Sequence, residues 1–152
     1  MTGFGRTGKT FAGEHANIKP DFICISKALT AGTLPMSAVL TSTNIYNLFY
    51  DDYETGKAFL HSNTYGGNAL AAAVANVVID IHLSENINLQ SQKLELHLVR
   101  GIKQVEQETQ CLTNIRHIGS MIAADLNLPI ERSGFKLFKK ALKFGAFLRP
   151  LG

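Results

Sequence analysis

One lysine, Lys27, stands where its amine could do covalent chemistry. It follows the apolar run DFICIS (21–26) and precedes the small residues of ALTAG (28–32). A lysine is seldom buried without a partner, so its place at the end of a predicted buried strand needs a reason. Desolvation and nearby positive charge lower the pKa of a lysine, and a neutral amine can form a Schiff base with a carbonyl. Alternatively, the side chain reaches water along its own stem and has no chemical role.

The opening segment carries a second candidate. GFGRTGKT (3–10) matches the phosphate-loop pattern G-x-x-x-x-G-K-[ST], in which backbone N–H groups and the lysine bind nucleotide phosphates. That motif needs a buried strand before it and a helix that begins at the lysine. Gly13 and Pro20 interrupt the following segment, so the context argues against nucleotide binding. The apolar run NVVID (76–80) resembles the strand that ends in a magnesium-binding aspartate in phosphate-loop proteins. It falls in a predicted helix, however, where we expect Asp80 to face water.

The elements that must position these residues alternate between strands and helices, which is typical of α/β architecture. Apolar runs rich in branched side chains predict strands over 21–26, 36–42 and within 112–128, with a further strand starting in 146–152. Helical spacing of apolar residues predicts helices over 43–53, 68–83, 84–110 and 133–145. The expected caps are Thr43, Asn68, and the pair Ser133 and Gly145 around the last helix. The character of the helices changes near Ser84, which marks a domain boundary.

Composition excludes several classes of protein. Hydrophobic residues make up 45% and charged residues 18%, with a formal net charge of +3, so the chain is globular rather than disordered or collagen-like. Cys24 and Cys111 lie far apart and outside any C-x-x-C pair, so we expect free thiols. The histidines show no metal-ligand spacing. We therefore expect a cytoplasmic protein that binds no metal, no nucleic acid and no membrane.

Several stretches together resemble the class III (omega) aminotransferases, which use pyridoxal 5'-phosphate. These stretches are TGFGRTGK (2–9), EH and PD within 14–21, KALTAG (27–32) and NTYGGN (63–68), in the order and spacing of the family. FYDDY (49–53), KAFLH (57–61) and LRPLG (148–152) resemble in particular the members that act in biotin biosynthesis. Those members transfer an amino group from S-adenosyl-L-methionine to 8-amino-7-oxononanoate and give 7,8-diaminononanoate.

The resemblance implies roles around the cofactor. Lys27 would hold pyridoxal phosphate covalently and would move the proton between substrate carbon and cofactor carbon. Thr64, with Asn63 beside it, would bind the cofactor phosphate of the neighbouring subunit, so the active family member would be a homodimer. The alternative is that Thr64 only shapes the turn before the helix.

The resemblance also implies roles around the small-molecule substrates, an amino donor and a keto acid. Arg149 would pair with the carboxylate of the keto acid, a task that suits a planar guanidinium; the alternative is an ordinary surface arginine. Ser62 stands where the family usually has glycine and the backbone meets substrate. Arg6 would touch the substrate side of the site.

The resemblance implies a fold type I transferase. Residues 1–84 would form the second part of the large, cofactor-binding domain, and 85–152 an incomplete small C-terminal domain. The family carries an aspartate for the pyridinium nitrogen just before the stretch that matches 2–9, so we expect a fragment with exposed strand edges, apolar surface and little activity alone. Another omega-aminotransferase, or a noncatalytic relic that pairs with a full subunit, remains an alternative.

Overall fold

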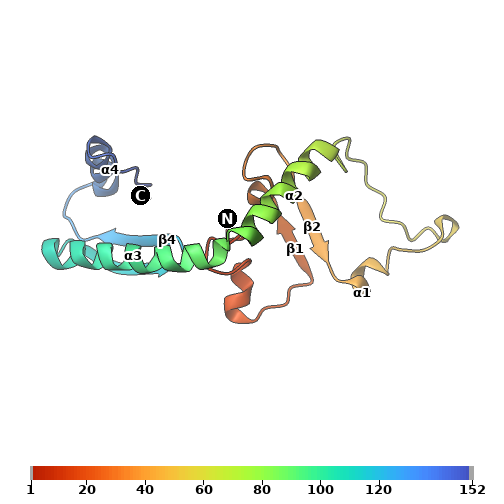
Figure 1. The fold of residues 1–152 in the computed structure, drawn as a ribbon, viewed down its shortest axis with the longest axis horizontal. Coiled ribbons are helices and arrows are strands. Elements are labelled where there is room, and N and C mark those ends of the chain that lie inside the picture. Colours follow the sequence, from red (N-terminus) through yellow and green to blue (C-terminus); the bar gives the residue numbers. More distant parts are fainter. Residues whose placement is uncertain (1, 151–152) are drawn as a thin grey trace. The chain divides into compact units, whose positions relative to one another are not determined.

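The computed structural model describes residues 2–150, which form a mixture of helices and strands (Figure 1). This mixture confirms the class expected from the sequence. The chain divides into two compact units, Met1–Lys93 and Leu94–Gly152, and the division falls within helix α3. The assignment of 1–84 and 85–152 to two family domains stays a prediction.

The first unit contains a two-stranded antiparallel ribbon. Strand β1 (Phe22–Ile25) pairs with β2 (Ala38–Thr41), with Phe22 opposite Thr41 and Ile25 opposite Ala38. The expectation that β1 is a buried strand is wrong, because Phe22 is 56% exposed. Only the alternate residues Ile23 and Ile25 are half-buried, which is the period of two of a strand that is covered on one face.

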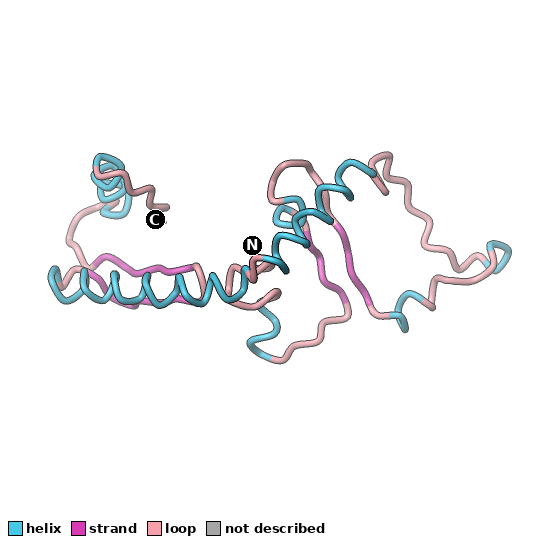
Figure 2. Tube along the Cα trace, in the orientation of Figure 1, coloured by secondary structure: helices cyan, strands magenta, loops and turns pink. Residues whose placement is uncertain are grey.

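The helix predicted over 43–53 is much shorter in the structure. Helix α1 (Thr43–Tyr46) makes one turn, and the 3₁₀ helix η3 (Tyr53–Thr55) follows after a break. Ser42 rather than Thr43 caps α1, because the Ile45 N–H donates to its hydroxyl at 3.4 Å. Leu48 remains 67% exposed, so no packing extends a helix that is too short to be stable alone. Figure 2 shows the long loop between α1 and α2, interrupted only by η3.

Helix α2 (Ala69–Ser84) carries most of the small core of the first unit. Asn68 is its N-cap as predicted, because its side-chain oxygen accepts the N–H groups of Leu70 at 3.0 Å and Ala71 at 3.3 Å. Ala71 and Ala75, one turn apart, are buried. Their small side chains let the 3₁₀ helix η2 (Lys27–Thr30) pack against α2. Asp80 is exposed on α2, as expected.

The second unit follows the predicted order. Helix α3 (Ile87–Thr109) enters it from the first unit, and strands β3 (Leu112–Ile118) and β4 (Met121–Leu126) form an antiparallel hairpin with a register shift between Thr113 and Arg116. His117 on β3 pairs with Glu95 on α3 at 2.6 Å. Of the residues described in this unit, no apolar side chain is buried.

Helix α4 (Ser133–Lys143) confirms the last predicted helix but not both of its caps. Ser133 is already the first helical residue, and Arg132 occupies the cap position without a side-chain hydrogen bond. At the other end Gly145 takes the expected position, with its N–H donating to the Leu142 carbonyl at 3.1 Å. The predicted final strand is absent over 146–150, and residues 151–152 lie outside the described part.

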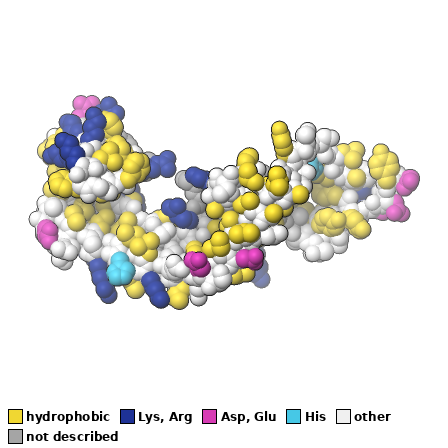
Figure 3. Space-filling model, turned by 45° about the horizontal axis from the view of Figure 1, so that its top comes forward, with side chains coloured by type: hydrophobic (Ala, Val, Ile, Leu, Met, Phe, Trp, Pro, Cys, Tyr) yellow, Lys and Arg dark blue, Asp and Glu magenta, His cyan; other side chains and the backbone are white. Residues whose placement is uncertain are grey.

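Apolar side chains remain at the surface of both units (Figure 3). Over α2, Leu70 is 75% exposed and Leu83 is 70% exposed. Both cysteines are free thiols, as expected. No single helix within 2–150 is long and apolar enough to cross a membrane. Taken together, the consecutive helices α2 and α3, with a bend between them, reach the required length and apolar composition.

Candidate active site

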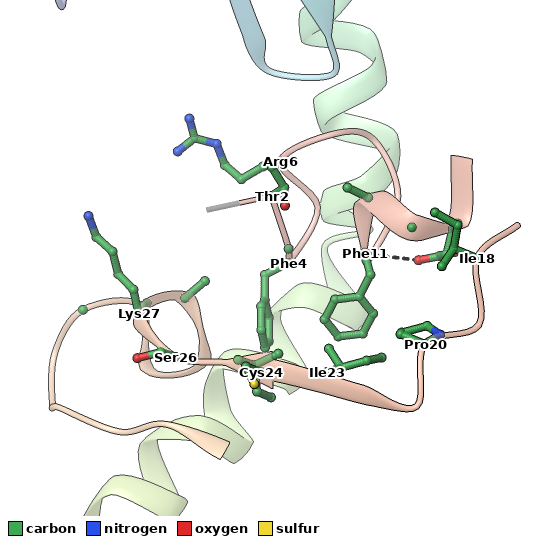
Figure 4. A pocket seen from close by; sticks show the side chains of 18 residues that line it. Thr2, Phe4, Arg6, Phe11, Ile18, Pro20, Ile23, Cys24, Ser26 and Lys27 are labelled. Carbon is green, nitrogen blue, oxygen red and sulfur yellow. Dashed lines mark hydrogen bonds between the residues drawn. The ribbon is translucent and has the colours of Figure 1, made fainter. Parts of the chain in front are cut away.

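A cavity of about 650 Å³ borders Lys27 in the first unit (Figure 4). This volume lies within the usual range of small-molecule sites, about 300–1,000 Å³. The glycine-rich opening supplies Phe4 to its wall, the adjoining segment supplies Phe11 and Ile18, and β1 supplies Ile23. These side chains are apolar, so the cavity suits the flat face of an aromatic ligand.

Local hydrogen bonds fix the backbone around Lys27. The Ser26 hydroxyl donates to the Met36 carbonyl at 3.1 Å, and the Leu29 N–H donates to the Ser26 carbonyl at 2.6 Å. Leu29 and Thr30, in the same turn as Lys27, are buried on the side of α2. Lys27 itself is exposed at the cavity rim. The structure therefore fixes the backbone next to this lysine and leaves its side chain accessible.

The glycine-rich opening brings Arg6 to the same cavity as Lys27. In Figure 4 the side chains of Arg6 and Lys27 both extend away from the rings of Phe4 and Phe11. Those two rings meet edge to face, with centroids 6.0 Å apart. Two cationic groups and an apolar wall thus border one space.

The same segment lacks the geometry of a nucleotide phosphate loop. Lys9 is exposed, and the next helix, η1 (Ala12–Ala16), is a short 3₁₀ helix that begins after it. The N-terminus of a helix at the motif lysine, which would direct N–H groups at phosphate, is missing here. This arrangement agrees with the argument made from the sequence context.

Ser62, Asn63 and Thr64 lie on the exposed loop before α2, and none of them lines the Lys27 cavity. The Asn63 side chain accepts the Tyr65 N–H at 3.0 Å, and the Asn63 carbonyl accepts the Gly66 N–H at 2.9 Å, which makes a tight turn. Asn68 already accepts two N–H groups at the start of α2. A phosphate at this loop would therefore depend on the Thr64 hydroxyl more than on the end of the helix.

Arg149 belongs to the second unit, where it is exposed and lies outside any helix or strand. Within the first unit the structure brings together Lys27 and Arg6 on one cavity, whereas Ser62, Asn63 and Thr64 do not line it. The roles of all six residues stay predictions.

The residues around the Lys27 cavity fit an aromatic aldehyde cofactor such as pyridoxal phosphate. A primary amine stands at the rim of an apolar cavity, and aldehydes are the partners that such an amine takes covalently. Sequence reasoning missed the walls, Phe4 and Phe11. The aromatic residues flanking the glycines of 3–8 were the available signal.

Comparison with known proteins agrees with this chemistry. The family model described as "Aminotransferase class-III" matches residues 1–152. Among curated relatives, the adenosylmethionine-8-amino-7-oxononanoate aminotransferase of Helicobacter pylori is 46% identical over 154 residues, which is 99% of this chain and 35% of the relative. The chain thus spans about a third of the length of such relatives.

Solved structures give the same result. The crystal structure of the adenosylmethionine-8-amino-7-oxononanoate aminotransferase of Methanocaldococcus jannaschii superposes with a TM-score of 0.85 at 31% identity, over 99% of this chain and 37% of that one. An amine transaminase from an uncultivated Pseudomonas species, solved with pyridoxal phosphate bound, gives a TM-score of 0.86 at 27% identity, over 99% of this chain and 36% of that one. These neighbours confirm the fold type I expectation. Because the family model matches residues 1–152, the chain belongs to the class-III aminotransferase family.

Proposed function

We propose that the chain serves a pyridoxal-phosphate-dependent aminotransferase that moves an amino group from S-adenosyl-L-methionine to 8-amino-7-oxononanoate in biotin biosynthesis. The observation that carries the proposal is the Lys27 amine at the rim of an apolar cavity, directly after β1. The name of the relative that is 46% identical supports the choice of substrates.

Pyridoxal phosphate, when bound, supplies the electron sink that stabilises negative charge at the substrate carbon. The Lys27 amine would hold this aldehyde cofactor, and as a free amine it would move the proton at the substrate carbon. Its anchored backbone keeps that amine within reach, because Leu29 and Thr30 in the same turn are buried. The ring of Phe4 lines one side of the cavity and gives it an apolar surface.

The remaining roles concern substrate and assembly. Arg149 pairs with the substrate carboxylate, Arg6 lies on the substrate side, and Ser62 borders the substrate through its backbone. Asn63 and Thr64 bind the cofactor phosphate of a second copy, which makes the working form a homodimer. We propose a cytoplasmic location for this enzyme.

Covalent labelling tests the central claim. The chain is incubated with pyridoxal phosphate, its visible spectrum is recorded, borohydride is added, and the labelled peptide is mapped by mass spectrometry. Label should concentrate on Lys27 and disappear in Lys27→Ala. Lys19→Ala, which removes another exposed lysine of the first unit, should leave the label in place. Label spread evenly over surface lysines would contradict the proposal.

The amino donor needs its own measurement. S-adenosyl-L-methionine should change the visible spectrum of the cofactor-loaded chain, whereas ornithine at the same concentration should not. A response to ornithine alone would point to another omega-aminotransferase. A chain that labels at Lys27 yet responds to no donor would match the low activity expected of it alone; a missing response also in the presence of a full subunit would point to a noncatalytic partner.

A further inference from the structure

We propose that the start of α3 positions the glycine-rich segment 3–10, which forms part of the wall of the Lys27 cavity. The three residues concerned, called here the α3 clamp, are Asn88, Ser91 and Gln92. The inference rests on the proposed function, because it assigns positioning residues to that same site. None of the three lines the cavity.

Each clamp residue donates one side-chain hydrogen bond to the segment. The spacing i, i+3 and i+4 puts the three side chains on one face of the helix. The bonds run from Asn88 Nδ2 to Thr10 Oγ1 at 3.1 Å, from Ser91 Oγ to the Arg6 carbonyl at 3.3 Å, and from Gln92 Nε2 to the Gly8 carbonyl at 2.7 Å.

The segment also lies in direct steric contact with the helix. A Cβ atom on Gly5 would stand 2.8 Å from Ile87 Cγ2 and 3.2 Å from Asn88 Oδ1. Gly5 and Thr7 are buried, and Ser91 is only 7% exposed. The helix therefore fixes both the position and the depth of the segment.

The segment needs such support because part of its backbone is strained. Phe4 has a φ of +54°, a left-handed conformation that is rare for an aromatic residue. Conformations of this kind persist only where the surroundings determine them. Phe4 and Arg6, both in this segment, line the Lys27 cavity. Loss of the clamp should therefore loosen the cavity wall without touching Lys27.

The test variant is Gln92→Glu in the full chain. It keeps the length of the side chain, removes the N–H donor and turns a carboxylate toward the Gly8 carbonyl. The matched control is Gln90→Glu on the same helix, because Gln90 Nε2 bonds to the Glu85 carbonyl and not to the segment. Thermal melting of both variants, followed by far-UV circular dichroism, reports whether the fold is retained.

Two readouts distinguish positioning from general stability. The pyridoxal phosphate concentration that half-saturates label on Lys27 should rise by at least about three- to tenfold in Gln92→Glu. Loss of one neutral hydrogen bond accounts for that much, and repulsion between the new carboxylate and the Gly8 carbonyl adds to it. The maximal label should stay the same. Amide hydrogen exchange of 3–11 should quicken in Gln92→Glu, and Gln90→Glu should match the unsubstituted chain in both measurements.

A second pair keeps the inference testable if Gln92→Glu does not fold. Ser91→Ala should weaken labelling in the same way, and Ser91→Thr, which retains the hydroxyl, should restore it. Unchanged half-saturation in the folded variants, or equal changes in Gln90→Glu, would overturn the clamp. If the unsubstituted chain takes no label on Lys27, the proposed function and the positioning role fail together. Exchange over 3–11 would then report only whether α3 holds the segment.

Discussion

Replacing Gly5 by alanine should destabilise the first unit by more than a backbone effect alone. The residue has a φ of +86°, which costs an ordinary residue about 1–2 kcal/mol. Its new Cβ would also stand 2.8 Å from Ile87 Cγ2, and overpacking of that kind costs about 1–3 kcal/mol. We therefore expect a total loss of about 2–5 kcal/mol in the free energy of unfolding.

Gly32→Ala is the matched control for this prediction. Gly32 has a similar φ of +81°, but no heavy atom lies within 4 Å of its Cβ position. Its substitution should cost only the backbone part, about 1–2 kcal/mol. Urea denaturation followed by far-UV circular dichroism gives the free energy of unfolding of both variants. The comparison requires that the slope of this free energy against urea concentration stays the same in both. Equal losses in the two variants would refute the close contact between the opening segment and α3.

Other substitutions probe separate parts of the chain. Asn68→Ala should lower the free energy of unfolding by about 1 kcal/mol in urea denaturation, because two N–H groups of α2 lose their acceptor. Gly101→Ala should raise the melting temperature, since alanine favours a helix interior by about 1 kcal/mol and its Cβ meets nothing within 4 Å. Hydrogen bonds from Asn114 and then Arg116 hold the pKa of Asp125 below its ordinary 3.8. Stability from Asp125 is therefore present above pH 3.8 and is lost as the pH falls through the lower folded pKa. In an NMR titration, Asn114→Ala should move this pKa back up.

Local patterns in the sequence predicted the helices well. Asn68 could be identified as a cap because its acceptor role depends only on the next few residues. The apolar spacing of 84–110 gave α3 for the same reason. The helix over 43–53 was wrong because Leu48 stays 67% exposed, and the burial that would stabilise a longer helix is a tertiary property. The exposure of one face of β1 could not be predicted from the local sequence either, because it depends on which other segments cover Phe22.

The same difference between local motifs and long-range contacts applies to the candidate site. Lys27 and Arg6 were found through short motifs, and the structure places both on one cavity. The clamp on the opening segment was not predicted, because Ser91 and Arg6 are 85 residues apart in the chain. Polar residues at helical spacing look like an ordinary solvated face until the partner segment is known.

The small number of buried apolar side chains has a calorimetric consequence. Among the residues described, only Leu29, Ala71 and Ala75 are buried apolar side chains. The heat-capacity increment of unfolding arises mainly from apolar surface that becomes hydrated, so this chain alone should show a small increment. The free energy of unfolding of this chain would then change little with temperature on either side of its maximum. The calorimetric endotherm would be broad.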